Sequence, residues 1–460
     1  MIMKKQHFCI TGLLVLMAAF NLMLSSCSPR QEKEGTLISH VINPEWSIRA
    51  NIYEVNTRQF TKEGTFNAFR EHLPRLQNMG VDILWFMPIT PIGEVNRKGT
   101  LGSYYSVKNY REVNPEFGTM EDFKALVAEA HELGMYVILD WVANHTAWDN
   151  YLVNEKPEWF TRDENGELVS PYDWSDVVDL NYDVPEVWDY MIDALKFWVE
   201  EANVDGYRCD VAFLVPTEFW NRARRELDEI KPVFMLAEAE EPEHHEFAFD
   251  MSYGWAMHHV MNEVAAGKKN ANHIDSMILV NQNQFPPEAI LMHFTSNHDE
   301  NSWAATEFTR LGDGVLTFAV LKATIPGMPL IYSGQEAAMD KMLEFFEKDE
   351  IDWSDIPYES FYRELLTLKH RVPALWNGIH GGTYQRIPAG DDEKIFAFMR
   401  SKSNSEVLVI LNFSDVLVET NLIGNKFAGE YKAAFVYEVF SFEENAEIVM
   451  APWEYRIYYR

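Results

Sequence analysis

Hydrophobic positions along this chain follow two alternating patterns from about residue 45 onward. Short runs rich in Val, Ile, Leu and Phe predict strands that are buried on both faces. Between them lie longer segments whose apolar residues recur at helical spacing, such as 121–133, which Gly134 is placed to end. The alternation indicates parallel strands connected by helices.

Eight strand runs precede residue 378, and eight strands in this order favour an α/β fold of the (β/α)8 TIM-barrel type. The predicted strand runs are 48–55, 81–86, 135–140, 206–211, 233–238, 246–251, 289–295 and 329–333. The clearest helix runs are 66–79, 121–133, 187–199 and 217–230. The barrel is therefore expected to occupy residues 45–377.

Two regions depart from this alternation. Residues 144–185 are rich in Asn, Asp, Trp and Pro without a sustained period, which predicts a short excursion domain inserted after the third strand. From residue 378 the helices stop, and runs such as 394–399 and 407–413 predict strands instead. We expect a C-terminal antiparallel β-sandwich domain over 378–460.

Residues 1–26 have the features of an export signal. Two lysines precede an apolar run over 8–24, which is too short and too often interrupted by polar residues to span a bilayer. The run ends in Leu-Ser-Ser-Cys, similar to a bacterial lipobox, so Cys27 is the expected lipid anchor; a plain signal peptide is the alternative. Residues 27–44 would then tether a lipoprotein to a bacterial membrane, facing the periplasm or the cell exterior.

Composition narrows the classes of ligand. The chain has 71 acidic and 39 basic residues and a formal net charge of −32 at pH 7. This excess of carboxylates argues against nucleic acid, whose phosphates require Lys and Arg, and it is compatible with a neutral polar ligand. Once residues 1–26 are removed, Cys209 is the only thiol besides Cys27, so no disulfide framework is expected.

Residues 205–210 read Asp-Gly-Tyr-Arg-Cys-Asp and follow a predicted helix, which makes them a short strand. Because side chains alternate along a strand, Arg208 and Asp210 lie on one face. A guanidinium placed in this way holds a carboxylate in its ionised form, so Asp210 is a candidate nucleophile. A purely structural ion pair is the alternative for the same two residues.

Polar residues stand at the C-terminal ends of several predicted strands. In a barrel of this type the C-terminal ends of the strands carry the active site. Four such stretches read Asp-Trp-Val-Ala-Asn-His at 140–145, Gly-Tyr-Arg-Cys-Asp at 206–210, Met-Leu-Ala-Glu at 235–238 and Phe-Thr-Ser-Asn-His-Asp at 294–299. In type, order and placement they resemble the signature regions of the α-amylase family of retaining glycoside hydrolases, glycoside hydrolase family 13. The resemblance also includes 52–55, 102–117 and 327–336, and it covers nearly all of the chain after the export signal.

The resemblance implies a role for each matching residue. Asp210 would be the nucleophile, Glu238 the general acid/base, and Asp299 a third carboxylate that holds sugar hydroxyls as the ring distorts. The implied substrate-binding residues are Tyr105 as the platform beneath the sugar, Arg208 as the partner of Asp210, and His145 and His298 as hydroxyl ligands. No cofactor is required for this chemistry. Asn144 matches a calcium ligand of many relatives, but calcium needs six to eight oxygen ligands and the rest of that shell is not identified.

Retaining cleavage needs one carboxylate to attack the anomeric carbon and one carboxylic acid to protonate the leaving oxygen. Arg208 is expected to keep Asp210 charged. The apolar run before Glu238 and its acidic neighbours favour the protonated form of Glu238. The pair is therefore expected to titrate unequally.

The resemblance implies cleavage of α-1,4-glucosidic bonds in starch-derived glucans or maltooligosaccharides through a covalent glycosyl-enzyme intermediate. Many starch-cleaving relatives carry Lys-His where this chain has Phe213 and Leu214, which argues against cleavage inside long polymers. A transglycosylase or isomerase of α-glucosides uses the same intermediate and stays open. A third candidate is a non-catalytic starch-binding lipoprotein, which could dispense with the carboxylates that this chain keeps.

Overall fold

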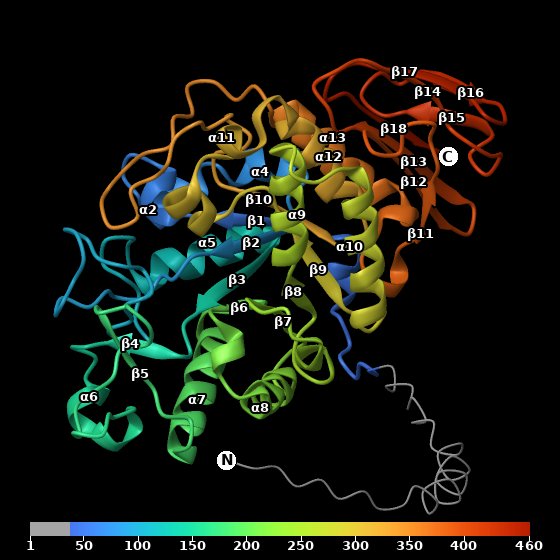
Figure 1. Ribbon diagram of the computed structural model, residues 1–460. Helices are drawn as coiled ribbons and strands as arrows, with labels where there is room; N and C mark the ends of the chain where they lie inside the picture. Colours follow the sequence, from blue (N-terminus) through green and yellow to red (C-terminus); the bar gives the residue numbers. More distant parts are fainter. Residues whose placement is uncertain (1–36) are drawn as a thin grey trace, which may run out of the picture. The chain divides into compact units, whose positions relative to one another are not determined.

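The computed structural model describes residues 37–460, in which eight parallel strands close into a barrel (Figure 1). Around the barrel the strands follow the order β1-β10-β9-β8-β7-β6-β3-β2, and β2 pairs with β1. Their bounds are β1 (Ile52–Val55), β2 (Ile83–Phe86), β3 (Tyr136–Trp141), β6 (Gly206–Cys209), β7 (Phe234–Ala237), β8 (Met251–Tyr253), β9 (Ile290–His293) and β10 (Met328–Tyr332). The predicted (β/α)8 barrel is confirmed.

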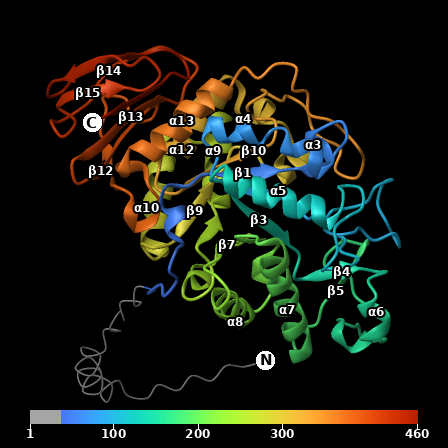
Figure 2. The same cartoon turned by 180° about the vertical axis from the view of Figure 1, so that it is seen from behind.

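Helices surround the barrel on the outside (Figures 1 and 2). Their bounds are α2 (Thr57–Phe60), α3 (Phe66–Arg70), α4 (Leu73–Met79), α5 (Met120–Glu132), α7 (Pro185–Ala202), α8 (Thr217–Asp228), α9 (Trp255–Ala265), α10 (Ala271–Gln284), α11 (Glu307–Leu311), α12 (Val315–Thr324) and α13 (Glu359–Arg371). One more short helix, α6 (Leu152–Glu155), lies in the excursion after β3 (Figure 1). The four helix runs that the sequence predicts all occur, although one of them is divided.

That divided run, 66–79, forms α3 and α4 rather than one helix. Pro74 lies in the first turn of α4, where its missing N–H is tolerated, and a proline ring clashes with the carbonyl group four residues earlier. The first strand is also shorter than predicted, because residues 45–49 form a 3-10 helix. The sixth predicted strand, 246–251, is displaced toward its end, since β8 begins at Met251.

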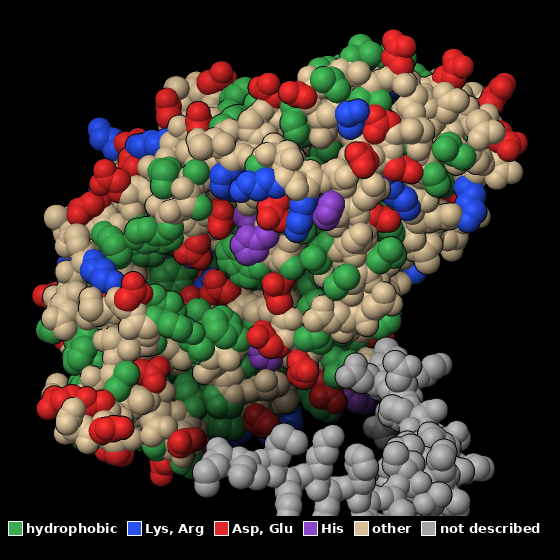
Figure 3. All heavy atoms as spheres, in the orientation of Figure 1, with side chains coloured by type: hydrophobic (Ala, Val, Ile, Leu, Met, Phe, Trp, Pro, Cys, Tyr) green, Lys and Arg blue, Asp and Glu red, His purple; other side chains and the backbone are tan. Residues whose placement is uncertain are grey.

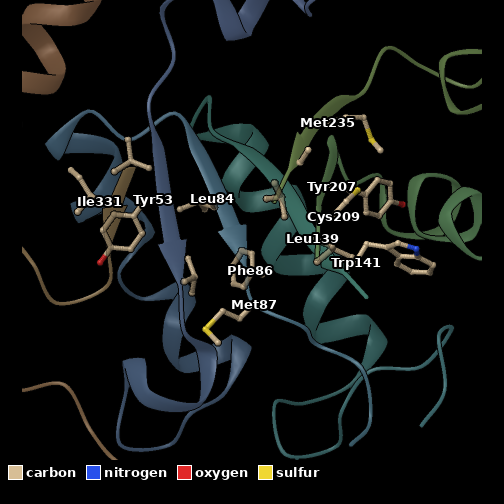
Figure 4. Packing of buried hydrophobic residues seen from close by; sticks show 14 of the residues in the cluster. Tyr53, Leu84, Phe86, Met87, Leu139, Trp141, Tyr207, Cys209, Met235 and Ile331 are labelled. Atoms are coloured by element: carbon tan, nitrogen blue, oxygen red, sulfur yellow. The ribbon is translucent and has the colours of Figure 1, made fainter. Parts of the chain in front are cut away.

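Alternate side chains of the barrel strands enter two different cores. Ile52, Ile138 and Phe234 belong to the cluster of buried residues inside the barrel. The next residue on each strand belongs to the layer between strands and helices; Figure 4 shows part of that layer, with Leu84 and Leu139 among its labelled side chains. This period of two decides which side chains can reach the barrel axis.

Two further regions match the predicted plan. The excursion after β3 contains a short antiparallel pair, β4 (His145–Ala147) and β5 (Val177–Asp179). The C-terminal strands form a six-stranded antiparallel sheet in the order β11-β12-β13-β18-β15-β16 and a two-stranded sheet of β14 and β17. Their bounds are β11 (Thr383–Ile387), β12 (Ile395–Lys402), β13 (Ser405–Asn412), β14 (Val418–Asn421), β15 (Gly429–Ala433), β16 (Val439–Phe442), β17 (Glu447–Met450) and β18 (Tyr455–Tyr459). These strands lie beside α12 and α10 (Figures 1 and 2).

The predicted export signal and Cys27 lie outside the described residues. Residues 38–460 form one compact unit, within which the division at 377/378 stays a prediction. The end of the predicted tether is hydrogen-bonded to this unit, since the His40 N–H donates to the Glu246 carbonyl at 2.8 Å and the Ser39 hydroxyl donates to the His245 carbonyl at 2.7 Å. Within 37–460 the helices are all too short or too polar to cross a bilayer.

Candidate active site

The polar residues of the candidate site continue the inward-facing series of the barrel strands. Two residues after inward-facing Ile138 comes Asp140, and two residues after inward-facing Leu236 comes Glu238. Backbone bonds extend the sheet beyond the strand ends, because the Asp210 N–H donates to the Trp141 carbonyl at 2.9 Å and the Glu238 N–H to the Cys209 carbonyl at 3.0 Å. The same alternation that fills the barrel therefore directs these carboxylates toward its axis.

Arg208 connects three carboxylates at the centre of the site. Its Nη1 donates to Asp140 Oδ1 and to Asp210 Oδ1, both at 2.9 Å. Its Nη2 lies 2.8 Å from Glu238 Oε2, without the geometry of a hydrogen bond. The Nε donates to the Tyr253 hydroxyl at 3.1 Å, and the side chain is fully buried. One guanidinium thus brings the predicted nucleophile and the predicted acid/base together.

Burial dominates the titration of these groups. It raises the pKa of Asp210 to about 7 and that of Glu238 to about 7, and in both cases the Arg208 charge opposes the rise. Burial raises the pKa of Asp140 to about 6, again against Arg208. Arg208 contacts Asp210 as expected, but the expected unequal titration of the pair is not seen, because the second arm of the guanidinium also reaches Glu238 and burial raises both pKa values to about 7. Two carboxyl groups with raised pKa values on one guanidinium can retain a proton near neutral pH, as retaining hydrolysis requires.

His298 forms the other side of the site. Its Nδ1 lies 2.5 Å from Glu54 Oε1, and its Nε2 lies 2.7 Å from the Tyr105 hydroxyl and 3.3 Å from Asp299 Oδ2. Burial lowers the pKa of His298, but Asp299 and Glu54 outweigh burial and raise it to about 9. An imidazolium at this point donates from both ring nitrogens. The Tyr105 hydroxyl accepts one of these hydrogen bonds and itself donates to Asp140 Oδ2 at 3.0 Å.

His145, by contrast, is held neutral. It is buried, and burial lowers its pKa to about 3. Its ring contacts Trp174 edge to face with the centroids 5.4 Å apart, and both side chains line the same cavity as the carboxylates. A neutral imidazole can donate to or accept from a sugar hydroxyl without adding charge to the site.

The predicted residues surround one cavity of about 500 Å³. Its wall includes Asp210, Glu238 and Asp299, whose side chains are 10%, 12% and 36% exposed. Tyr105 and His298 also line it, while Arg208 lies behind the wall. The structure therefore brings the three carboxylates to one opening, as the resemblance implies.

Three aromatic residues of the cavity wall were not singled out as binding residues from the sequence. Phe345 lies parallel to Tyr105 at 6.2 Å between ring centroids, and Trp303 packs against Phe345 at 5.1 Å and against Phe346 at 5.5 Å. The Trp303 side chain is 56% exposed. Such a ring presents a flat apolar face on which a pyranose can stack. The exposed tryptophan four residues after Asp299 was the one signal in the sequence.

Two polar groups and one backbone position were given no role from the sequence. Glu54 is fully buried beneath His298, and Asp140 links Arg208, Tyr105 and Trp85. Val211 has a φ of +37°, a conformation that branched residues rarely adopt, and its N–H donates to Glu238 Oε2 at 2.8 Å. The strained turn after Asp210 therefore orients the carboxyl group of Glu238.

Asn144 lies away from the carboxylates, beside a separate cavity that Asp179 and Asp183 also line. Its amide nitrogen is 3.3 Å from His145 Nδ1, and burial raises the pKa of Asp179. Within residues 37–460 no cluster of three or more His, Cys, Asp or Glu side chains could hold a metal ion. The side chains around Asn144 therefore include two carboxylates, those of Asp179 and Asp183, and no chemical step is assigned to calcium.

Comparison with known proteins adds to this geometry. The family model described as the alpha amylase catalytic domain matches residues 47–388. A crystal structure of a noncanonic maltogenic alpha-amylase from Thermotoga neapolitana is 32% identical with a TM-score of 0.81, over 89% of this chain and 98% of that one. An alpha-amylase structure from Lactobacillus plantarum is 31% identical with a TM-score of 0.81, over 90% of this chain and 99% of that one.

A curated relative is more distant. Alpha-amylase MalA of Haloarcula japonica is 27% identical over 416 residues, which cover 85% of this chain and 60% of that enzyme. This chain therefore spans about three fifths of that relative's length.

Proposed function

The chain belongs to the α-amylase family, and from that premise we propose that it hydrolyses α-1,4-glucosidic bonds of maltooligosaccharides or starch fragments with retention of configuration. The observation that carries this proposal is the contact of one buried guanidinium with both Asp210 and Glu238 at the wall of an open cavity. The family's chemistry needs no cofactor.

In the first step an Asp210 carboxylate oxygen attacks the anomeric carbon, and the bond to the leaving sugar breaks as Glu238 delivers a proton to the glycosidic oxygen. In the second step Glu238 takes a proton from water, whose oxygen attacks the same carbon and releases Asp210. The Arg208 contacts orient both carboxyl groups. The second step reverses the proton movement of the first, so Glu238 ends each cycle protonated.

The remaining residues hold the sugar in the cleaved position. Asp299, the most exposed of the three carboxylates, can accept from two hydroxyls, and the Nε2–H of protonated His298 can be shared between the Tyr105 hydroxyl and a third sugar hydroxyl. The Tyr105 ring lies beneath the same position, held by its bonds to Asp140 and His298. Hydrogen bonds of this kind gain strength as charge develops on the distorted ring.

The test is the replacement Asp210→Asn, assayed by reducing-end release from maltoheptaose. The variant removes the attacking oxygen and keeps the size of the side chain, so turnover is expected to fall by at least about 10⁴-fold. Asp415→Asn, the same change at an exposed residue of the C-terminal region, should leave turnover unchanged. Comparable turnover in Asp210→Asn would overturn the proposed function.

Transglycosylation is the second candidate function, and Phe213 favours it. Its ring is 47% exposed three residues after Asp210, where many starch-cleaving relatives carry a lysine. An apolar face on the leaving-group side can hold a sugar acceptor and exclude water. Chromatography of products at high maltotriose concentration decides between the two: products longer than the substrate indicate transfer.

We also propose that Cys27 carries a lipid and that the enzyme acts outside the bacterial cytoplasm. Support comes from the apolar run over 8–24 and the Leu-Ser-Ser-Cys ending. Mass spectrometry of the mature amino terminus tests this proposal. A diacylated Cys27 supports it, and an intact first residue or cleavage elsewhere contradicts it.

A further inference from the structure

A second cavity, of about 470 Å³, lies between the barrel and the C-terminal sheet. It is bordered by the residues around β9, by the turn that precedes β10, and by the end of β12 (Figures 1 and 2). Its wall shares no residue with that of the catalytic cavity. Nothing in the proposed hydrolysis uses it.

The charge of this cavity is opposite to that of the chain. The basic side chains of Arg400 and Lys402 line it, and none of the described residues in its wall is Asp or Glu. Its other polar side chains are neutral, among them Asn281, Gln282 and His293, whose pKa burial lowers to about 4. The whole chain, however, has 71 acidic and 39 basic residues, and Figure 3 shows acidic side chains spread over one face of the molecule. The absence of acidic side chains from this cavity wall therefore differs from the acidic composition of the chain as a whole.

Arg400 provides the strongest sign of a missing anion. Its side chain is 1% exposed and donates only to backbone carbonyls, those of Gly382 at 3.1 Å, Thr324 at 3.2 Å and Trp376 at 3.3 Å. Within residues 37–460 no carboxylate forms an ion pair with it. A buried charge without a counterion is strongly destabilising, and a guanidinium has five N–H donors, so two remain available here.

A second buried basic side chain lies next to Arg400. The Lys369 side chain is 1% exposed, and its Nζ donates to the carbonyls of Gly327 at 3.1 Å and Leu375 at 2.7 Å. Burial and the nearby Arg400 charge both lower the pKa of Lys369. Since Gly327 lines the cavity, Lys369 lies directly behind its wall. Lys369 therefore provides no counterion for Arg400.

We propose that this cavity binds a phosphate-type oxyanion, either free or carried by a sugar, with Arg400 and Lys402 as its charged partners. The free donors of the Arg400 fork match two oxygens of a phosphate group, and Lys402 supplies a point charge from the more exposed side. Asn281 and Gln282 add neutral donors for the remaining oxygens or for sugar hydroxyls. A bound anion would link the barrel to the C-terminal sheet.

Thermal unfolding of the whole protein tests the site. Millimolar phosphate is expected to raise Tm by about 2 °C in a saturable way over sodium chloride of equal ionic strength, because a ligand that binds the folded state stabilises it. Glucose 6-phosphate and neutral glucose are the companion probes. Glucose should give no shift. A sugar phosphate that binds about tenfold more tightly than phosphate identifies the carried form, and equal affinities identify the free anion.

Lys402→Glu places a negative charge in the cavity wall and should abolish the phosphate shift while glucan hydrolysis continues. Lys426→Glu is the matched control, since it makes the same charge change at an exposed residue outside the wall. Arg400→Met should also abolish the shift, but it leaves three carbonyls unpaired. If that variant does not fold, Lys402→Glu decides the question. The proposal is overturned by an absent phosphate shift in the wild type, or by an equal shift in Lys402→Glu and Lys426→Glu.

Discussion

Arg208→Met tests the electrostatic design of the active site most directly. The substitution removes the only cation that contacts Asp210, Glu238 and Asp140 among the described residues, and it keeps an apolar side chain of similar length. The Coulomb energy of two unit charges about 4 Å apart is about 4 kcal/mol at an effective dielectric constant of 20. That energy corresponds to about three units of pKa.

Burial raises the pKa of Asp210 to about 7 while Arg208 opposes the rise. Loss of Arg208 therefore leaves the nucleophile almost wholly protonated at pH 7. A pKa about three units higher leaves about one molecule in a thousand ionised, so kcat at pH 7 should fall on the order of a thousandfold. Because kcat falls through the loss of ionised Asp210, the fall in kcat should become smaller as the pH rises and more of Asp210 ionises.

The assay is the pH profile of kcat and kcat/KM on maltoheptaose between pH 5 and 10, with the fold of each variant checked by circular dichroism. Arg208→Lys keeps the charge but cannot contact two carboxylates with one planar group, and an intermediate loss is expected. Arg222→Met, at a partly exposed arginine of α8, is the control and should match the wild type. A folded Arg208→Met enzyme that keeps more than about a tenth of kcat at pH 7, or that loses equal activity at pH 7 and pH 9, refutes the reasoning.

Four further predictions follow from the same geometry. Glu238→Gln should lose most activity on maltoheptaose but still release a burst of about one equivalent of fluoride from α-maltosyl fluoride, because that leaving group needs no proton in the first step while the second step still lacks its base; Asp210→Asn should give no burst, and the absence of a burst in Glu238→Gln contradicts the assigned roles. Because burial raises the folded-state pKa of Asp210 from 3.8 to about 7, its contribution to stability is present below about pH 4 and lost as the pH rises to about 7. Asp210→Asn should therefore raise Tm by a few degrees at pH 8 and by nothing at pH 4, measured by calorimetry, and an equal change at both values excludes this linkage. Trp303→Ala should raise KM for maltoheptaose about tenfold with kcat nearly unchanged, since the ring binds sugar away from the reacting bond, and Phe247→Ala, also at an exposed aromatic side chain, is the control that should change neither. Removal of calcium with a chelator should change Tm by less than about 1 °C, because within residues 37–460 no cluster of three or more His, Cys, Asp or Glu side chains could hold a metal ion; a large drop would establish a calcium site.

Much of the central site was predictable because strands repeat with a period of two. Once the runs 135–140 and 233–238 are identified as strands, Asp140 and Glu238 fall at their ends on the inward face. The same parity places Arg208 and Asp210 together, and the observed 2.9 Å contact agrees. The prediction failed where a side chain has more than one neighbour, since the second contact of Arg208 with Glu238 comes from another strand.

The contacts that the sequence did not predict lie where distant segments meet. Glu54 and His298 are 244 positions apart, and their contact depends on closure of the barrel between β1 and β10. The aromatic wall has the same origin, because Phe345 and Trp303 belong to loops that follow different strands. Loops of this length carry no period, so their approach leaves no local signal.

The sequence by itself determined the order of strands and helices, the identity of the three acids and the face on which each lies. The order and the faces are consequences of local hydrophobic period, which neighbouring residues encode, whereas the three acids were identified by the resemblance of their motifs to the α-amylase family. Only the tertiary structure decided how the acids share one guanidinium, which aromatic rings surround the sugar, and that an acid-free cavity lies behind the barrel. Each of these depends on burial and on contacts between remote segments, and both arise only when the barrel closes.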